Sequence, residues 1–395
     1  MLRSKLPLVG TTIFTTMSAM AAEYGAINLS QGYPDFSPPA ALLDALSKAL
    51  ADGKNQYPPM IGIHELREQI QHKVLGMYRA DVDLNTEITI TSGATEALFV
   101  AIQASVQQGD EVIVLDPAYD AYDPAIQLAG GRAVHVSMTS AFAIDWQQVE
   151  DSITAKTSTL IINSPHNPSG SVLTSSDLVE LSRLVERHNL TVISDEVYEH
   201  MVFDGQPHLS LLSHPELRAR SFVISSFGKT YHATGWKVGY AIAPTAYTVE
   251  FRKIHQFVTF TTHTPSQYAI ADYMQHHGEH HIELPSFYQE KRDLFLALMD
   301  KSQFKMTPTP GTYFQLADYS AISDLDDVNF AAHLTQVVGV AAIPISVFYN
   351  SPPNQKVVRF CFAKSDDTLK LAAEKLVAFS NSNTPGTSTS QVGGS

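Results

Sequence analysis

Lys229 is the residue whose position most directly suggests chemistry. The apolar run from Ser221 to Ile224 predicts a buried strand, and Lys229 follows it among small and hydroxyl residues. A buried ammonium is costly unless it is paired or neutral, and an amine with a lowered pKa is a nucleophile that forms Schiff bases with aldehydes. This stretch therefore predicts a lysine that carries an aldehyde, although a lysine reaching out to solvent remains an alternative here.

The tripeptide Gly228-Lys229-Thr230 also resembles the end of a phosphate-binding P-loop. That motif requires another glycine five positions before Gly228. Position 223 is Val223, so the spacing excludes a P-loop.

Groups suited to anion binding and ring stacking follow two earlier predicted strands. Ser92 to Thr95 comes after the strand 88–91 and opens a helix, whose N-terminal N–H groups can face a phosphate. Tyr119 comes just after the strand 111–115 and can stack on a flat ring. From these segments alone, an ordinary helix cap and a tyrosine in the core are the alternatives.

An amide and a carboxylate follow two later predicted strands. Asn167 lies in a proline-rich turn after the strand 159–162, where the turn would hold its amide rigidly. Asp195 follows the strand 190–193, with Tyr198 one helical turn further on. A carboxylate at the inner end of an apolar strand is costly without a partner, and a protonated heterocyclic nitrogen would supply one. A purely structural turn and a helix cap by Asp195 are the alternatives.

The elements that must position these groups form an alternating pattern of strands and helices. The predicted strands are 88–91, 111–115, 133–136, 159–162, 190–193 and 222–224. This alternation predicts an α/β fold with a mostly parallel central sheet covered by helices. Ligands of such sheets bind beyond the carboxyl ends of the strands, where these groups lie. From about residue 285, a long helix (287–301) and further elements predict a smaller second domain, and the polar residues 380–395 predict a disordered tail.

Composition excludes several classes of function. The chain has 395 residues, of which 44% are hydrophobic, and a net charge of −14, which disfavours nucleic acid and anionic membranes as partners. Its single cysteine, Cys361, excludes an intramolecular disulfide and suits the cytoplasm. Residues 6–22 resemble a secretory signal, but Pro7 and Gly10 interrupt the apolar core that a signal needs. No run approaches the length of a membrane span.

Taken together, the ends of five of the six predicted strands supply a phosphate seat, a ring stack, an amide, a carboxylate and an amine. These are the parts that a pyridoxal phosphate (PLP) enzyme needs. The chain resembles the class I (fold-type I) aminotransferases over residues 5–379. Ser-Phe-Gly-Lys-Thr-Tyr-His-Ala-Thr-Gly-Trp-Lys-Val-Gly (226–239) and Asn-Leu-Ser-Gln-Gly-Tyr-Pro-Asp-Phe (28–36) resemble most the branch with kynurenine/glutamine aminotransferases and bacterial methionine aminotransferase.

The resemblance implies a division of the chain and a set of roles. Residues 1–45 would form the N-terminal arm and part of the small domain, 46–284 the large PLP-binding domain, and 285–379 the small C-terminal α/β domain. Lys229 would hold PLP as a Schiff base and then act as the catalytic base, and Asp195 would keep the ring nitrogen protonated. The remaining cofactor contacts would come from Tyr119 on the ring, Asn167 and Tyr198 on its phenolic oxygen, and Gly93, Ala94, Thr95, Ser226 and Lys237 at the phosphate.

The resemblance also implies a homodimer with shared active sites. Tyr57 of the neighbouring subunit would complete the phosphate site, and Arg359 would bind the substrate α-carboxylate as a bidentate pair, with Gly32 beside it. Outside this family, an arginine in such a strand is more often an edge residue facing water. Ile13, Phe14 and, from the neighbouring subunit, Phe260 would line an apolar side-chain pocket.

Two positions depart from the pattern of many class I members, which have arginine where this chain has Lys237 and serine where it has Gly228. Both forms occur in the resembled branch. A lysine offers the phosphate a single point charge, whereas an arginine offers several N–H donors in a fixed fork.

The implied reaction is ping-pong transamination, through pyridoxamine phosphate, of an L-amino acid (methionine, aromatic or glutamine-like) with a 2-oxo acid. A PLP carbon–sulfur β-lyase with the same lysine is the alternative enzyme, and an amino-acid-sensing regulator is the non-enzyme alternative. The latter usually carries a DNA-binding module, for which the short N-terminus leaves no room. No metal is expected, and the histidines at 276, 277, 280 and 281 are expected to form a solvated polar face.

Overall fold

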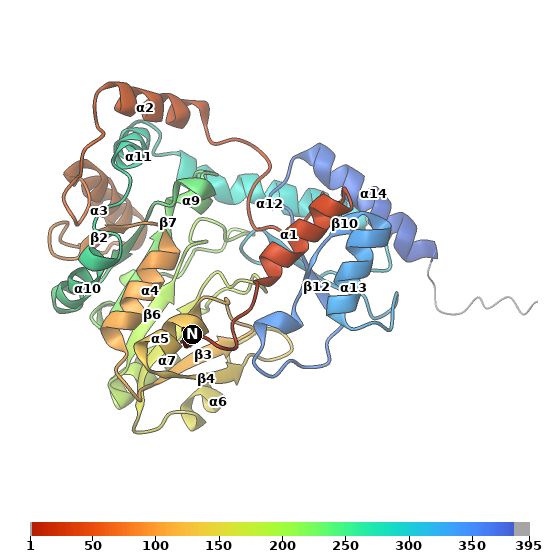
Figure 1. The fold of residues 1–395 in the computed structure, drawn as a ribbon, viewed down its shortest axis with the longest axis horizontal. Coiled ribbons are helices and arrows are strands. Elements are labelled where there is room, and N and C mark those ends of the chain that lie inside the picture. The colour runs from red at the N-terminus through yellow and green to blue at the C-terminus, as the bar shows by residue number, and fades with distance from the viewer. Residues whose placement is uncertain (1, 383–395) are drawn as a thin grey trace, which may run out of the picture.

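The computed structural model describes residues 2–382 (Figure 1). A seven-stranded sheet forms the larger part of the molecule and confirms the predicted mostly parallel α/β fold. Its strand order is β2 (Ile88–Thr91), β8 (Gly239–Ile242), β7 (Ser221–Ser226), β6 (Thr191–Asp195), β5 (Thr157–Asn163), β3 (Glu111–Asp116) and β4 (Arg132–Ser137). Only β8 runs antiparallel to its neighbours. Strand β3 is buried at every position, as expected for a strand covered on both faces.

Helices cover both faces of this sheet because their apolar sides need partners. On one face pack α4 (Ala94–Ser105), α5 (Tyr122–Ala129) and α10 (Thr245–Val258). On the other pack α2 (Ala40–Ala51), α3 (His64–Tyr78), α7 (Ser175–His188) and α11 (Thr264–His276). The shorter helices α6 (Trp146–Asp151) and α8 (Pro215–Arg218) add Val149 and Leu217 to the core on this second face. Each fully buried Leu, Ile or Val contributes roughly 1.5–3 kcal/mol to these layers.

A second core surrounds a small antiparallel sheet with the order β11 (Ile343–Pro344), β12 (Val357–Cys361) and β9 (Phe314–Asp318). The helices α12 (His280–Met299), α13 (Asp327–His333) and α14 (Asp366–Ser382) pack around it. The N-terminal segment joins this core. Strand β1 (Ile27–Asn28) pairs in parallel with β10 (Val340–Ala341), and α1 (Ile13–Glu23), which buries Met17 and Ala21, packs against β10 (Figure 1).

Two expectations about the C-terminal part need comment. Helix α14 continues to Ser382, so residues 380–382 are helical, and the expectation that disorder begins at residue 380 is wrong for these three. They stay ordered because Ser380 is fully buried and accepts a hydrogen bond from the Gln303 backbone N–H. Residues 383–395 lie outside the described residues. Helix α12 runs without a break across the predicted boundary at 284/285, which remains a prediction together with the other domain boundaries.

Within residues 2–382, no helix combines the length and apolarity needed to cross a bilayer.

Gly170 is where the turn after β5 meets the segment before β9, and it gives a test of this packing. Its φ is +78°, and a Cβ there would lie 1.7 Å from Thr309 Oγ1. We expect Gly170→Ala to lower the free energy of unfolding by about 3 kcal/mol, through backbone strain and overpacking together. Gly205 has a φ of +71° with nothing within 4 Å, so Gly205→Ala should cost only about 1 kcal/mol from strain. Urea unfolding midpoints measure both, and equal losses would contradict the packing.

Candidate active site

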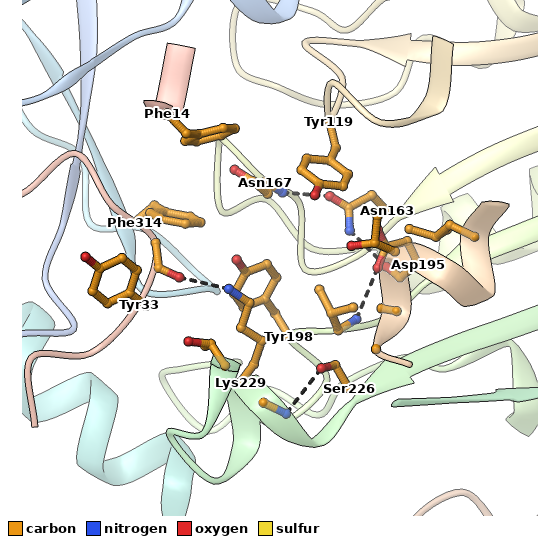
Figure 2. Close-up of a pocket in the computed structure, with 18 of the residues that line it drawn as sticks. Phe14, Tyr33, Tyr119, Asn163, Asn167, Asp195, Tyr198, Ser226, Lys229 and Phe314 are labelled. Atoms are coloured by element: carbon orange, nitrogen blue, oxygen red, sulfur yellow. Dashed lines mark hydrogen bonds between the residues drawn. The ribbon is translucent and has the colours of Figure 1, made fainter. Parts of the chain in front are cut away.

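A cavity of about 300 Å³ lies at the carboxyl ends of the central strands, facing the small sheet (Figure 2). Most of the residues predicted for the cofactor and the substrate line it. They are Phe14, Gly32, Gly93, Ala94, Thr95, Tyr119, Asn167, Asp195, Tyr198, Ser226, Lys229, Lys237 and Arg359. The topology explains this convergence, because the ends of parallel strands β3, β5, β6 and β7 meet at one edge of the sheet.

Lys229 projects into the cavity from the short helix α9 (Phe227–Thr230), which continues directly from β7. Ser226 caps this helix by accepting a hydrogen bond from the Gly228 N–H at 3.2 Å. The Lys229 Nζ donates to the Gly32 carbonyl oxygen at 2.8 Å and to the Tyr313 hydroxyl at 2.9 Å. The amine is therefore held in a fixed place inside the cavity.

Burial lowers the pKa of Lys229 to about 8 because the ammonium loses its hydration. Arg359 and Lys237 lower this pKa further by charge repulsion, whereas Cys361 and Asp195 raise it. About a tenth of the Lys229 side chains are then neutral at pH 7, far more than for an ordinary lysine, and the neutral amine is the form that attacks an aldehyde and removes a proton.

Asp195 lies at the end of β6 and is almost completely buried. Its Oδ2 accepts a hydrogen bond from the Tyr122 hydroxyl at 2.8 Å. Burial raises the pKa of Asp195 to about 6, although the hydrogen bond from Tyr122 opposes the shift. A carboxylate in this position is well suited to bind a cation that enters the cavity.

Asn163 and Asn167 connect the backbone of Asp195 to the small sheet. Asn163 Nδ2 donates to the Asp195 carbonyl oxygen at 2.9 Å, and its Oδ1 accepts from the Asn167 backbone N–H at 2.8 Å (Figure 2). Asn167 Oδ1 in turn accepts from Arg359 Nη1 at 2.7 Å. The turn 163–170, which contains two cis X-Pro bonds, fixes both amides.

Arg359 lies in β12 and is fully buried. Its guanidinium stacks 3.8 Å from the Phe314 ring centroid, and Nη2 donates to the Ser30 carbonyl oxygen at 3.1 Å. Its Nε has no hydrogen-bond partner in the described part of the chain. A buried donor without a partner is costly, so the guanidinium is prepared to bind an acceptor such as a carboxylate.

The start of α4 has the features of an anion site. Gly93 precedes the helix with a φ of +79°, which leaves the N–H groups of Ala94 and Thr95 at the helix N-terminus. Lys237 Nζ lies 3.3 Å from where a Cβ of Gly93 would stand. The glycine therefore leaves room for this ammonium beside the helix start, and the Ser226 hydroxyl lines the same cavity.

Two tyrosines form further parts of the wall. Tyr119 is oriented by an edge-to-face contact with Tyr122, at 5.7 Å between ring centroids. Tyr198 is buried, and its ring packs edge-on against Tyr313 at 5.2 Å. Burial raises the pKa of Tyr198, so its hydroxyl is protonated at neutral pH.

The structure does not bring three of the predicted residues to this cavity. Tyr57 is 82% exposed and Phe260 is 46% exposed, and their rings contact each other edge-to-face at 5.6 Å. Ile13 packs against the core of the small sheet, so its prediction as a pocket residue is not supported by the cavity lining.

The sequence analysis gave no role to Tyr33, Asn163 and Phe314, which line the cavity, or to Tyr122 and Tyr313, which contact Asp195 and Lys229. Tyr122 is one turn after Tyr119, Asn163 opens the proline-rich turn and Tyr33 directly follows Gly32, so their positions carried a weak signal. Tyr313 and Phe314 carried none, because packing of the small sheet places them at the site. Among the histidines, His280 and His281 are partly buried, and His280 Nε2 lies 3.0 Å from the Thr230 carbonyl oxygen. The expected solvated face is therefore wrong for these two. No group of three or more His, Cys, Asp or Glu residues within 2–382 is arranged to hold a metal.

Comparisons with known proteins agree with this geometry. The family model "Aminotransferase class I and II" matches residues 24–376. Methionine aminotransferase of Escherichia coli is 50% identical over 95% of this chain and 97% of its own length. Human kynurenine–oxoglutarate transaminase 3 is 34% identical over 94% of this chain and 88% of its own length. An E. coli crystal structure with a methionine aminotransferase function superposes with a TM-score of 0.94 at 49% identity, covering 96% and 99% of the two chains.

These matches cover nearly the whole chain, and they confirm the predicted family and its kynurenine aminotransferase branch. The chain therefore belongs to the class I and II aminotransferases and catalyses transamination with pyridoxal phosphate, the cofactor that this family implies.

Proposed function

We propose that this chain transaminates an L-amino acid with a methionine-like, aromatic or glutamine-like side chain, with a 2-oxo acid as the acceptor. The observation that carries the proposal is that one cavity holds Lys229, with its lowered pKa, and Arg359, whose Nε has no hydrogen-bond partner among residues 2–382. An amine and a guanidinium in one cavity suit a substrate that carries both a reactive Cα and a carboxylate.

The residues of the cavity fit pyridoxal phosphate. When bound, this cofactor supplies an aldehyde that condenses with amines and a protonated ring that withdraws electrons. The N-terminus of α4 with Lys237 and Ser226 would hold its phosphate, and the Asp195 carboxylate would bind its ring nitrogen. Tyr119 would stack on the ring, and Asn167 and Tyr198 would hydrogen-bond its phenolic oxygen.

The protein side of the reaction follows from the charges in the cavity. Arg359, with Asn167 Oδ1 holding its Nη1, would orient the substrate α-carboxylate beside Gly32. The neutral amine of Lys229 would then take the Cα proton and hold it at Nζ. The proton would later be delivered to the carbon on the other side of the substrate nitrogen. The Asp195 carboxylate would stay ionised and would balance the charge of the ring cation bound next to it.

The side-chain preference rests on the cavity wall. Phe14, Tyr33 and Phe314 contribute aromatic surface, and the cations among the lining residues are Lys229, Lys237 and Arg359, each with a role already proposed. A second carboxylate would find no further cation there. The names of the relatives, methionine aminotransferase and kynurenine–oxoglutarate transaminase, support the same preference.

We also propose that the active sites are shared in a homodimer. Tyr57 and Phe260 lie in an exposed apolar patch with Phe257 (86% exposed) and Val258 (48% exposed). An exposed patch of this kind is typical of an interface. A second copy would cover it and would bring Tyr57 and Phe260 to the neighbouring cavity. A cytoplasmic location, suggested by the single cysteine, remains a prediction.

The substrate proposal is tested with a panel of amino acids against one 2-oxo acid. We expect kcat/KM for methionine to exceed that for aspartate by at least about 100-fold, because about 3 kcal/mol or more is lost when a second carboxylate is buried unpaired. Lys229→Ala should abolish turnover and the absorbance of the bound aldehyde. A preference for aspartate would contradict the proposal, and ammonia released in proportion to oxo acid would favour the β-lyase.

The pKa of Asp195 predicts how cofactor binding depends on pH. The probe is 4-deoxypyridoxine 5′-phosphate, which has the ring nitrogen and the phosphate but no aldehyde. In the free protein Asp195 binds a proton below about pH 6, and it must lose that proton to bind the ring cation. Relative to pH 7, the affinity should therefore be about twofold lower at pH 6 and about tenfold lower at pH 5.

Asp195→Asn is the control for this titration because it removes the carboxylate and keeps the shape. The variant should bind the probe more weakly at pH 7 and should lack the additional tenfold loss at pH 5. Identical pH profiles of the two proteins, measured by calorimetry, would contradict the role of Asp195.

A shared active site predicts complementation between inactive variants. Lys229→Ala and Tyr57→Ala each disable the cavity in a different way, and a mixed dimer would contain one intact site. After joint refolding at limiting pyridoxal phosphate, random pairing should restore about a quarter of the native activity. Activity equal to the mean of the separate variants would show that Tyr57 does not act across an interface.

A further inference from the structure

The Tyr313 hydroxyl makes the closest side-chain contact with the Lys229 amine. Nζ donates to the Tyr313 oxygen at 2.9 Å and to the Gly32 carbonyl oxygen at 2.8 Å. The Tyr313 hydroxyl itself donates to the same Gly32 carbonyl. The amine, the hydroxyl and the carbonyl thus form a closed triangle, and no sequence motif indicated it.

The backbone holds Tyr313 firmly in this place. Thr312, directly before it, has a φ of +63°, which is strained for a β-branched residue. The Thr312 N–H donates to the Met201 carbonyl oxygen at 2.9 Å, and its hydroxyl accepts from the Phe314 N–H at 3.1 Å. The Tyr313 ring is fully buried against Tyr198 and Tyr288. Strain that the surroundings enforce at a reacting amine indicates a functional position.

We propose that Tyr313 is a catalytic residue of the transamination, whose hydroxyl oxygen stabilises the Lys229 ammonium that forms when Nζ takes the substrate Cα proton. This inference rests on the proposed role of Lys229 as the base. In the step, the Cα–H bond breaks, an N–H bond forms at Nζ, and the electron pair stays on the substrate. The Tyr313 oxygen and the Gly32 carbonyl oxygen then accept two of the three N–H bonds, and the third faces the substrate.

The charges around Nζ explain why such acceptors are needed. Arg359 and Lys237 repel the ammonium, and the Asp195 carboxylate, which attracts it, does not contact Nζ as the two oxygens do. Tyr198 also packs its ring near Nζ. Burial raises the pKa of Tyr313 well above its ordinary value, so its hydroxyl stays neutral and serves as an acceptor instead of a counter-charge. Without it, the ammonium would keep the Gly32 carbonyl as its single contacting acceptor.

The test compares Tyr313→Phe with the matched control Tyr288→Phe. Both tyrosines are fully buried, and the Tyr288 hydroxyl has no hydrogen-bond partner within the described residues. Both variants remove one hydroxyl and keep the ring. In the holoenzyme, kcat, KM and the kinetic isotope effect with Cα-deuterated methionine are measured. In the apoenzyme, the rate of imine formation with pyridoxal phosphate is measured as a function of pH.

Tyr313→Phe should slow turnover of the holoenzyme and speed imine formation in the apoenzyme. Loss of a hydrogen bond to the ammonium should lower kcat about tenfold, with KM changed less than about threefold and a larger isotope effect. The same loss should lower the apparent pKa of Lys229 by about one unit from its value of about 8, so that imine formation at pH 7 becomes faster. A merely structural defect would slow both reactions. Tyr288→Phe should leave both unchanged.

An unchanged Lys229 pKa, an unchanged kcat or the same effects in Tyr288→Phe would overturn the inference. If Tyr313→Phe does not fold, 3-fluorotyrosine at position 313 keeps the ring and makes the oxygen a weaker acceptor, and it should shift both readouts in the same directions by smaller amounts. Failure of the proposed function is distinguishable, because the native protein itself would then form no imine and no oxo acid.

Discussion

The cost of burying cations is the constraint on which this structure depends. Lys229 and Arg359 lie in one cavity between the large sheet and the small sheet, and burial lowers the pKa of each, to about 8 and about 10. The consequences differ. Lysine becomes partly neutral and hence reactive, whereas arginine stays charged and needs partners. Asn167, Ser30 and the Phe314 ring supply them from three separate segments.

These partners also hold the two parts of the molecule together at the site. The hydrogen bond between Arg359 and Asn167 joins β12 of the small sheet to the turn after β5 of the large one. The triangle of Lys229, Tyr313 and Gly32 joins α9 to the segment before β9 and to the N-terminal segment. The groups that would bind substrate are therefore the same groups that link the two cores, so substrate binding would be coupled to the packing of these cores.

A second cluster of buried charged residues supports two of the segments that line the cavity. Lys73 Nζ of α3 donates to Glu199 Oε1 at 2.6 Å and to the Tyr240 hydroxyl at 2.6 Å, and the Ser225 hydroxyl also donates to Glu199. Glu199 directly follows Tyr198, and Ser225 directly precedes Ser226, which lines the cavity. Removing one partner of such a buried pair costs roughly 3–5 kcal/mol, because the other charge remains without compensation. The cluster thus fixes the backbone that carries two of the site residues.

The sequence by itself determined the central sheet and the groups at its strand ends. Apolar runs with polar residues at their carboxyl ends are local patterns, so Asp195 and Lys229 could be assigned before any contact was known. Arg359 and Tyr57 required the family motif, because nothing local distinguishes them from surface residues. Only the tertiary structure placed Phe314 at the cavity and Tyr313 against Lys229, and turned His280 and His281 inward. The physical reason is that a strand end is set by short-range periodicity, whereas a contact between residues 84 positions apart, such as Lys229 and Tyr313, depends on how two cores pack.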